Sequence, residues 1–117
     1  MPRYVDGFLL AIPKKKMAAY KTISSQAGKV WKKYGALEYV ECVIDDVIPG
    51  FAAFGKAAKA RPGEAVVFSW IIYKSRAHRD AVNKKVLADP AIQQPPPSMP
   101  FDPKRMAMAG FKVLVDL

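Results

Sequence analysis

Residues 64–90 constrain the fold of this chain more than any other segment. The first ten, EAVVFSWIIY, are apolar at nearly every position, so both faces of the predicted strand need cover from other parts of the protein. From Ser75, a typical helix N-cap, the pattern changes to that of a charged amphipathic helix that should end at Asp89-Pro90. The chain has few other helices, and a second copy of the protein is therefore the expected cover for the free face of the strand.

The remaining elements follow from apolar periodicity and from proline and glycine positions. Residues 3–12, 37–44 and 110–117 are predicted strands, residues 14–34 a helix, and residues 91–100 an irregular, proline-rich connection. The order strand, helix, strand, strand, helix, strand is the βαββαβ pattern of a ferredoxin-like sandwich. Right-handed crossovers place strands one and three at the centre of a four-stranded antiparallel sheet, with both helices on one face. The predicted class is therefore α+β.

Length and composition bound the class of protein. The chain has 117 residues, which fits one domain over residues 1–117, and 51% hydrophobic residues, enough for a core. Its apolar runs are shorter than the roughly 20 residues of a membrane span, and its start lacks the form of a signal peptide. We therefore expect a cytoplasmic protein with no membrane partner. Cys42 is the single cysteine, and its apolar neighbours predict a small buried residue.

The net charge of +9 raises the question of an acidic partner. Seven lysines lie between residues 14 and 33. Helical spacing spreads most of them over the solvent side of one helix, which favours a solvated face over a nucleic-acid surface. Strand three lacks the glycine and basic residues of RNA-binding modules with this strand order. Non-specific, salt-dependent contact of the first helix with nucleic acid remains the alternative.

Three residues are candidates for catalysis: Asp6, Tyr73 and His78. His78 is the only histidine, but the run containing Ser75, His78 and Asp80 is too compact for a triad. Asp6 lies in a predicted central strand, where a carboxylate must be paired or have a raised pKa. It is expected either to pair with a basic residue at the strand end or to face a cleft between the sheet and its partner. One histidine without clustered carboxylates also predicts no metal site.

Arg76 and Arg79, in the first turns of the second long helix, are candidates for ligand binding. Guanidinium groups match carboxylate or phosphate bidentately, so the two could clamp an anion. The interpretation that we favour is ion pairing, within the chain or across the dimer, with partners expected among three aspartates: Asp45, Asp46 and Asp102.

Four blocks of the sequence also resemble a known family. They are YVDGF, AGKVWKKYGALEYVECVIDDV, VVFSWIIYKSRAHRDAVNKKVLADP and MPFDPKRMAMAGF. Together they cover nearly the whole chain and resemble the small bacterial YbaA-like proteins, a family of unknown function. The resemblance implies a ferredoxin-like fold of the dimeric α/β-barrel type and supplies no mechanism.

Three functions are compatible with these observations. The first is a homodimer, joined through the open sheet faces, that binds a small ligand in a cleft and has no assigned activity. The second is a cofactor-free oxygenase or isomerase acting on a small hydrophobic substrate, by analogy with other proteins of this fold. The third is non-specific nucleic-acid binding. No cofactor is predicted, and whether the protein is an enzyme is left open.

Overall fold

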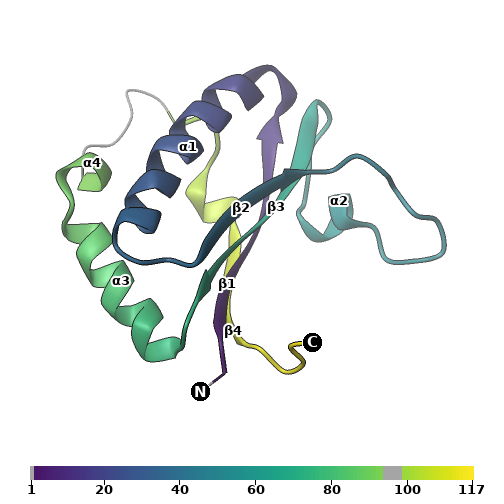
Figure 1. The fold of residues 1–117 in the computed structure, drawn as a ribbon. Helices are drawn as coiled ribbons and strands as arrows, with labels where there is room; N and C mark the ends of the chain where they lie inside the picture. The colour runs from purple at the N-terminus through teal and green to yellow at the C-terminus, as the bar shows by residue number, and fades with distance from the viewer. Residues whose placement is uncertain (1, 94–98) are drawn as a thin grey trace.

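The computed structural model describes residues 2–93 and 99–117 and has the predicted βαββαβ order (Figure 1). The four strands form one antiparallel sheet in the order β2-β3-β1-β4. The apolar strands are thus central and the charged strands lie at the edges, as predicted. The main elements are β1 (Tyr4–Pro13), α1 (Met17–Lys33), β2 (Glu38–Val43), α2 (Phe54–Ala57), β3 (Glu64–Tyr73), α3 (Arg76–Ala88), α4 (Pro90–Gln93) and β4 (Ala107–Lys112). Single 3₁₀ turns, η1 (Lys14–Lys16) and η2 (Pro103–Arg105), precede α1 and β4.

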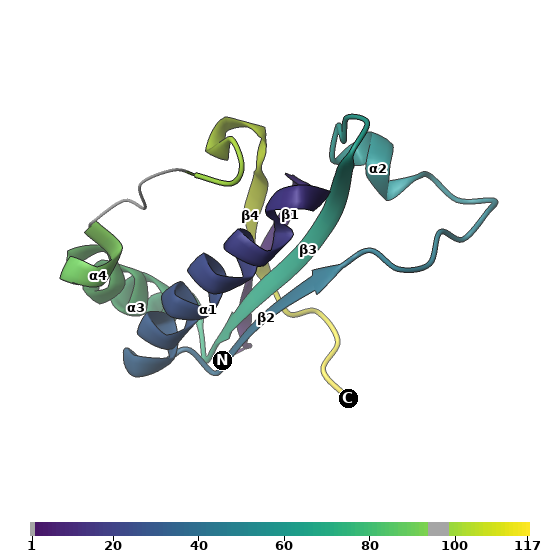
Figure 2. The same cartoon turned by 90° about the horizontal axis from the view of Figure 1, so that it is seen from above.

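Both long helices cover the same face of the sheet (Figures 1 and 2). The pairing of β1 with β3 decides which side chains meet them. Even-numbered residues of β1 and odd-numbered residues of β3, such as Leu10 and Val67, point toward the helices and are buried. In the described part of the chain, neither long helix covers the opposite face of the sheet (Figure 2). The ferredoxin-like architecture predicted from the sequence is therefore confirmed.

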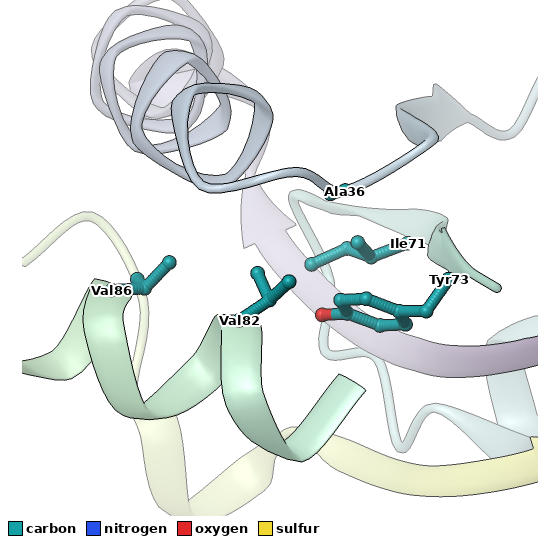
Figure 3. Packing of buried hydrophobic residues seen from close by; sticks show 5 residues of the cluster. All are labelled: Ala36, Ile71, Tyr73, Val82 and Val86. Carbon is teal, nitrogen blue, oxygen red and sulfur yellow. The ribbon is translucent and has the colours of Figure 1, made fainter. Parts of the chain in front are cut away.

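Two apolar clusters fill the space between sheet and helices. One joins β3 to α3 through Ile71, Tyr73, Val82 and Val86, with Ala36 closing its end (Figure 3). The other cluster lies beneath the start of α1 and consists of Leu10, Ile12, Tyr20 and Val67. The half-buried ring of Phe8 packs against both clusters. The core is therefore continuous along β1.

The ends of the elements follow their predicted caps in two places. Ser75 accepts a hydrogen bond from the backbone N–H of His78 at the start of α3, and Asp102 accepts one from Lys104 at the start of η2. The prediction for the last strand was wrong: β4 begins and ends earlier than residues 110–117. Its length is set by pairing with residues 4–9 of β1, after which the chain has passed the end of its partner. Residues 90–93 form the short helix α4, not irregular chain, and residues 94–98 of that predicted loop lie outside the described part.

The open face of the sheet is apolar. Val66 is buried there by its neighbours, while Phe68, in line with it on β3, is 45% exposed. Phe111 of β4 is also exposed and lies over Gly7 of β1. Cys42 is exposed at the edge strand, directly opposite Phe68, so the prediction of a buried cysteine was wrong. Its apolar neighbours belong to a strand that is covered on one side only.

Membrane spanning is a separate question from the apolar open face. Within residues 2–93 and 99–117, the helices are all too short or too polar to cross a bilayer.

An ion pair links η2 to the beginning of β3. The Arg105 guanidinium donates to both carboxylate oxygens of Glu64, at 2.8 and 2.7 Å, and the backbone N–H of Arg61 donates to the same carboxylate. The hydrogen bonds from Arg105 and Arg61 lower the pKa of Glu64 to about 2. Since the unfolded value is about 4.3, this pair stabilises the fold above that pH and stops doing so as the pH falls toward 2.

The first prediction concerns this pair. We expect Glu64→Gln to lower the melting temperature by roughly 2–5 °C at pH 7, the size expected for a well-formed, half-buried ion pair near the surface. The difference between variant and wild type should shrink between pH 5 and pH 2. Thermal unfolding followed by circular dichroism at both ends of this range measures it. A difference that does not change with pH would contradict the assignment.

Candidate functional site between α1 and β2

An open groove of about 730 Å³ separates α1 from the edge strand β2. It exists because the two helices cover β1 and β3 fully but leave the helix-facing side of β2 partly free. Its lining combines apolar, hydroxyl and charged side chains: Met17, Tyr20, Lys21, Ser24, Ser25, Gly28, Lys29 and Lys32 from α1, Tyr39, Glu41, Cys42 and Val43 from β2, and Val67 from β3.

A carboxylate with three hydroxyl groups around it forms the polar centre of the groove. Tyr20 donates its O–H to Glu41, with 2.8 Å to each carboxylate oxygen. Ser24 also donates to Glu41, and its Oγ lies 3.0 Å from the hydroxyl of Tyr39. Because the Ser24 proton goes to the carboxylate, the Tyr39 O–H must donate to Ser24. The result is a directed chain from Tyr39 through Ser24 to Glu41.

Both tyrosines remain protonated over the ordinary pH range. Burial raises the pKa of Tyr20 far above its usual value, and the charge of Glu41 adds to this effect. Burial also raises the pKa of Tyr39 to about 12. Tyr20 and Tyr39 therefore serve as hydrogen-bond donors, and the carboxylate of Glu41 is the group in this centre that can accept a proton.

Gly28 fixes the distance between the helix and the edge strand. It is buried in the middle of α1, where glycine costs helix stability, and the Tyr39 ring lies against it. A Cβ at position 28 would be 2.6 Å from Cδ1 of Tyr39. The glycine thus lets the Tyr39 ring lie close enough to α1 for its hydroxyl to reach Ser24, one helical turn away.

Lysines line the helix side of the groove. Lys21, Lys29 and Lys32 are spaced by eight and three residues, which places them along one edge of α1. Lys32 donates to the backbone carbonyl of Leu37, which ties its ammonium to the end of the groove. Positive charge thus lies along the α1 edge of the groove, whereas the β2 side carries the Glu41 carboxylate next to apolar surface.

The sequence-predicted candidates lie elsewhere, beneath α3. The structure brings Asp6 and Arg79 together, with Nη1 of Arg79 2.7 Å from the carboxylate, and Asp6 is only 1% exposed. Burial raises the pKa of Asp6, against the opposing effects of Arg79, Tyr73 and Asn83. Tyr73 and Trp31 both donate to Oδ1 of Asn83. The buried polar atoms around Asp6 therefore have hydrogen-bond partners. Their enclosed position is that of a structural network.

Within one subunit, the aspartates predicted to pair with Arg79 are not its partners. Asp45 follows the end of β2, at the opposite end of the sheet from Arg79, and Asp102 caps η2. The observed partners are Asp6 and Asp80, and the Arg79 guanidinium also lies 4.9 Å from the centre of the Tyr4 ring. Asp6 faces the helices, not the open face, because even-numbered residues of β1 point to the helix side.

The remaining candidates are also placed on or near α3. His78 is half-buried, and its Nδ1 accepts a hydrogen bond from the backbone N–H of Lys74. Its ring lies edge-on to Tyr73, with the ring centres 6.1 Å apart. Arg76 is exposed on the first turn of the helix. None of these residues lines the groove between α1 and β2. Among the described residues, no three histidine, cysteine or acidic side chains are grouped as metal ligands.

Sequence reasoning did not find the groove residues. Glu38 and Glu41 lie on opposite faces of β2, so they do not form an acid/base pair. The available signal was the polar and small residues on α1: Ser24 and Gly28 are one turn apart, and Tyr20 precedes Ser24 by another turn. Three such residues on one line of a helix indicate a close approach to a polar neighbour.

Two solved structures share this fold. A dimeric ferredoxin-like protein from an uncultured marine organism matches over 100% of both chains, with a TM-score of 0.59 and 14% identity. An uncharacterised NIPSNAP domain protein from Burkholderia xenovorans matches over 95% of this chain and 94% of its own, with a TM-score of 0.52 and 15% identity. These similarities place the chain among the ferredoxin-like α+β proteins.

The sequence itself matches a family at much higher identity. Residues 3–103 match the family described as "Protein of unknown function (DUF1428)". The uncharacterised protein YbaA of Escherichia coli K12 is 45% identical over 115 residues, covering 97% of this chain and 98% of that protein. YbaA of Shigella flexneri matches to the same extent. The chain therefore belongs to the DUF1428 family, and the predicted resemblance to YbaA-like proteins is confirmed. These descriptions assign no reaction.

The second prediction tests the contact between Gly28 and Tyr39. Gly28→Ala should destabilise the protein by about 1–3 kcal/mol, because the new methyl group overpacks against the ring. Urea denaturation of the wild type and the variant measures this difference. The matched control is Gly55→Ala in α2, where nothing lies within 4 Å of the added Cβ. A gain in stability for Gly28→Ala, as helix propensity alone would give, would show that Tyr39 does not occupy this position.

Proposed function

We propose that this protein is a small-ligand-binding homodimer and that the groove between α1 and β2 is its binding site. The observation that carries the proposal is the directed hydrogen-bond chain from Tyr39 through Ser24 to Glu41, set inside an open groove of about 730 Å³. Ligand pockets typically combine apolar walls with a few fixed polar groups, and volumes of this size suit small organic molecules.

The charges around the groove favour one class of ligand. Lys21 and Lys29 offer positive charge along α1, while Met17, Val43 and Val67 offer apolar surface. The carboxylate of Glu41 already accepts hydrogen bonds from two hydroxyl groups, so its hydrogen bonding does not depend on a ligand. We therefore expect an organic acid with an apolar, ring-sized body, with the acid group toward the lysines.

The homodimer supplies the second copy that strand β3 needs on its open face. Phe68, Trp70 and Ile72 of β3 lie on that face, with Leu9 of β1 beside them. Burying roughly 600 Å² of such apolar surface per subunit would stabilise association by about 15 kcal/mol before the costs of association are subtracted. The dimeric state stated for one structural neighbour is in line with this assembly.

Glu41 also supports a second candidate function, proton transfer in a cofactor-free isomerase. A carboxylate inside a partly apolar groove can remove a proton from carbon next to a carbonyl group and return it to another atom of the same molecule. Tyr20 and Ser24 hold the carboxylate in place. No cofactor is needed, since the proton leaves the ligand and comes back to it.

The third prediction tests binding with phenylpyruvate, an organic acid with a ring and an acidic CH₂ group. In ¹⁵N-labelled protein, we expect its addition to shift the amide signals of Ser24, Gly28 and Cys42. Lys29→Glu should weaken binding at least tenfold. Lys56→Glu, the same change of charge on α2, should alter it less than twofold. Benzyl alcohol, of similar ring size but neutral, should bind much more weakly. Shifts confined to other parts of the protein would exclude the groove as the site.

The fourth prediction separates binding from catalysis. In D₂O, the protein should accelerate loss of the phenylpyruvate CH₂ proton signal at least tenfold over buffer. Glu41→Gln should abolish the acceleration while the ligand still shifts the same amide signals. Equal exchange with wild type and Glu41→Gln would leave the groove as a binding site and remove the isomerase candidate.

A further inference from the structure

Two segments with exposed apolar side chains project from the open side of the sheet. The first, here called the arm, is residues 44–53 between β2 and α2; the second, the tail, is residues 113–117 after β4. Both lie on the side away from α1 and α3 (Figures 1 and 2). They flank the open face, the arm near the β2–β3 edge and the tail near β4. Their exposed large apolar residues are Ile44, Val47, Ile48 and Phe51 in the arm and Leu114, Val115 and Leu117 in the tail.

Both segments are held in place by specific contacts at their bases. Next to the arm, the Phe54 ring packs edge-on against Phe68 of the open face, with centres 6.1 Å apart, and the N–H of Ile44 donates to Val66. At the tail, Asp116 accepts two hydrogen bonds from Arg3, at 2.9 and 3.0 Å. Held segments lose less conformational entropy when a partner covers them than free ones would.

We infer that the arm and the tail are clamps that grip a second copy of this chain, whose sheet lies on the open face between them. This inference rests on the proposed homodimer and adds how it is held. In a two-fold dimer each copy presents the same surfaces, so two arms and two tails would close around the paired sheets. The contact would extend well beyond the sheet faces and bring the buried area toward the roughly 800 Å² per partner of a stable interface.

Charge favours a second copy as the partner of the arm. Asp45 and Asp46 give the arm two negative charges and it has no basic residue, whereas the whole chain carries +9. An acidic, apolar arm is complementary to the basic body of another copy. Such complementarity aligns partners and suppresses wrong ones.

The fifth prediction is tested by sedimentation of the full chain over nanomolar to micromolar concentrations. Wild type should be a dimer, and Phe68→Asp, on the open face, should make it a monomer. Phe51→Asp, in the arm, should raise the dimer dissociation constant at least 100-fold, and Arg3→Ala, which frees the tail, about 5–10-fold. The control is Leu87→Asp on α3, because Leu87 is 64% exposed but lies in the helix layer. It should change the constant less than threefold.

The outcomes separate the clamps from the dimer itself. If wild type is a monomer at 50 µM, both the dimer and the clamps are wrong. If Phe68→Asp dissociates the dimer while Phe51→Asp behaves like Leu87→Asp, the sheets pair but the arm does not grip. Photo-crosslinking through p-benzoylphenylalanine at position 51 gives an independent reading. Covalent dimers of the purified protein are expected, and absence of a crosslink to a second copy would overturn the inference for the arm. Circular dichroism of each variant verifies that it is folded.

Discussion

The two central strands have apolar side chains on both faces, and the helices of one subunit cover only one of these faces. On the covered side, Leu10 of β1 and Val67 of β3 meet the helices and are almost fully buried. On the other side, Phe68 meets the ring of Phe54 from the short helix α2 and stays 45% exposed. Because alternation along a strand fixes both sets of side chains at once, the helix-side core and the free face are consequences of the same two segments.

The position of the groove follows from how far the helical layer extends. Two helices can cover the two central strands, but β2 lies at the sheet edge beside α1. The helix approaches this strand closely at Gly28, where the Tyr39 ring occupies the space of a side chain. Ser24, one turn away, and Tyr20, two turns away, donate hydrogen bonds to Glu41. The groove lies where α1 leaves β2 uncovered. A partly uncovered edge strand thus leaves room for the proposed binding site without weakening the core.

Local patterns predicted the order of the elements and their place in the sheet, because apolar periodicity and caps such as Ser75 are encoded in neighbouring residues. The end of β4 was not predictable in this way, since Lys112 pairs with Tyr4 and the strand therefore ends where its antiparallel partner β1 begins. The same limit applies to the site. Glu41 and Ser24 are 17 positions apart, and nothing local to either residue indicates the other. Asp6 and Arg79, which are 73 positions apart, show the same limit more strongly. Both residues were candidates from the sequence, but other aspartates were expected to pair with Arg79.

The buried network beneath α3 and the groove beside α1 divide the helical layer into two halves with different chemistry. Asp6 and Arg79 are enclosed, and removing one member of such a pair would leave an uncompensated buried charge, at a cost of about 3–5 kcal/mol. Tyr73, Trp31 and Asn83 add hydrogen bonds beside them, so side-chain contacts link α3 to β1, β3 and α1. The carboxylate of Glu41 is instead reached from an open groove, where a ligand can exchange hydrogen bonds with it. Through Trp31 in α1, these contacts hold the helix that carries Tyr20 and Ser24, which gives the open half of the layer the defined geometry that selective binding requires.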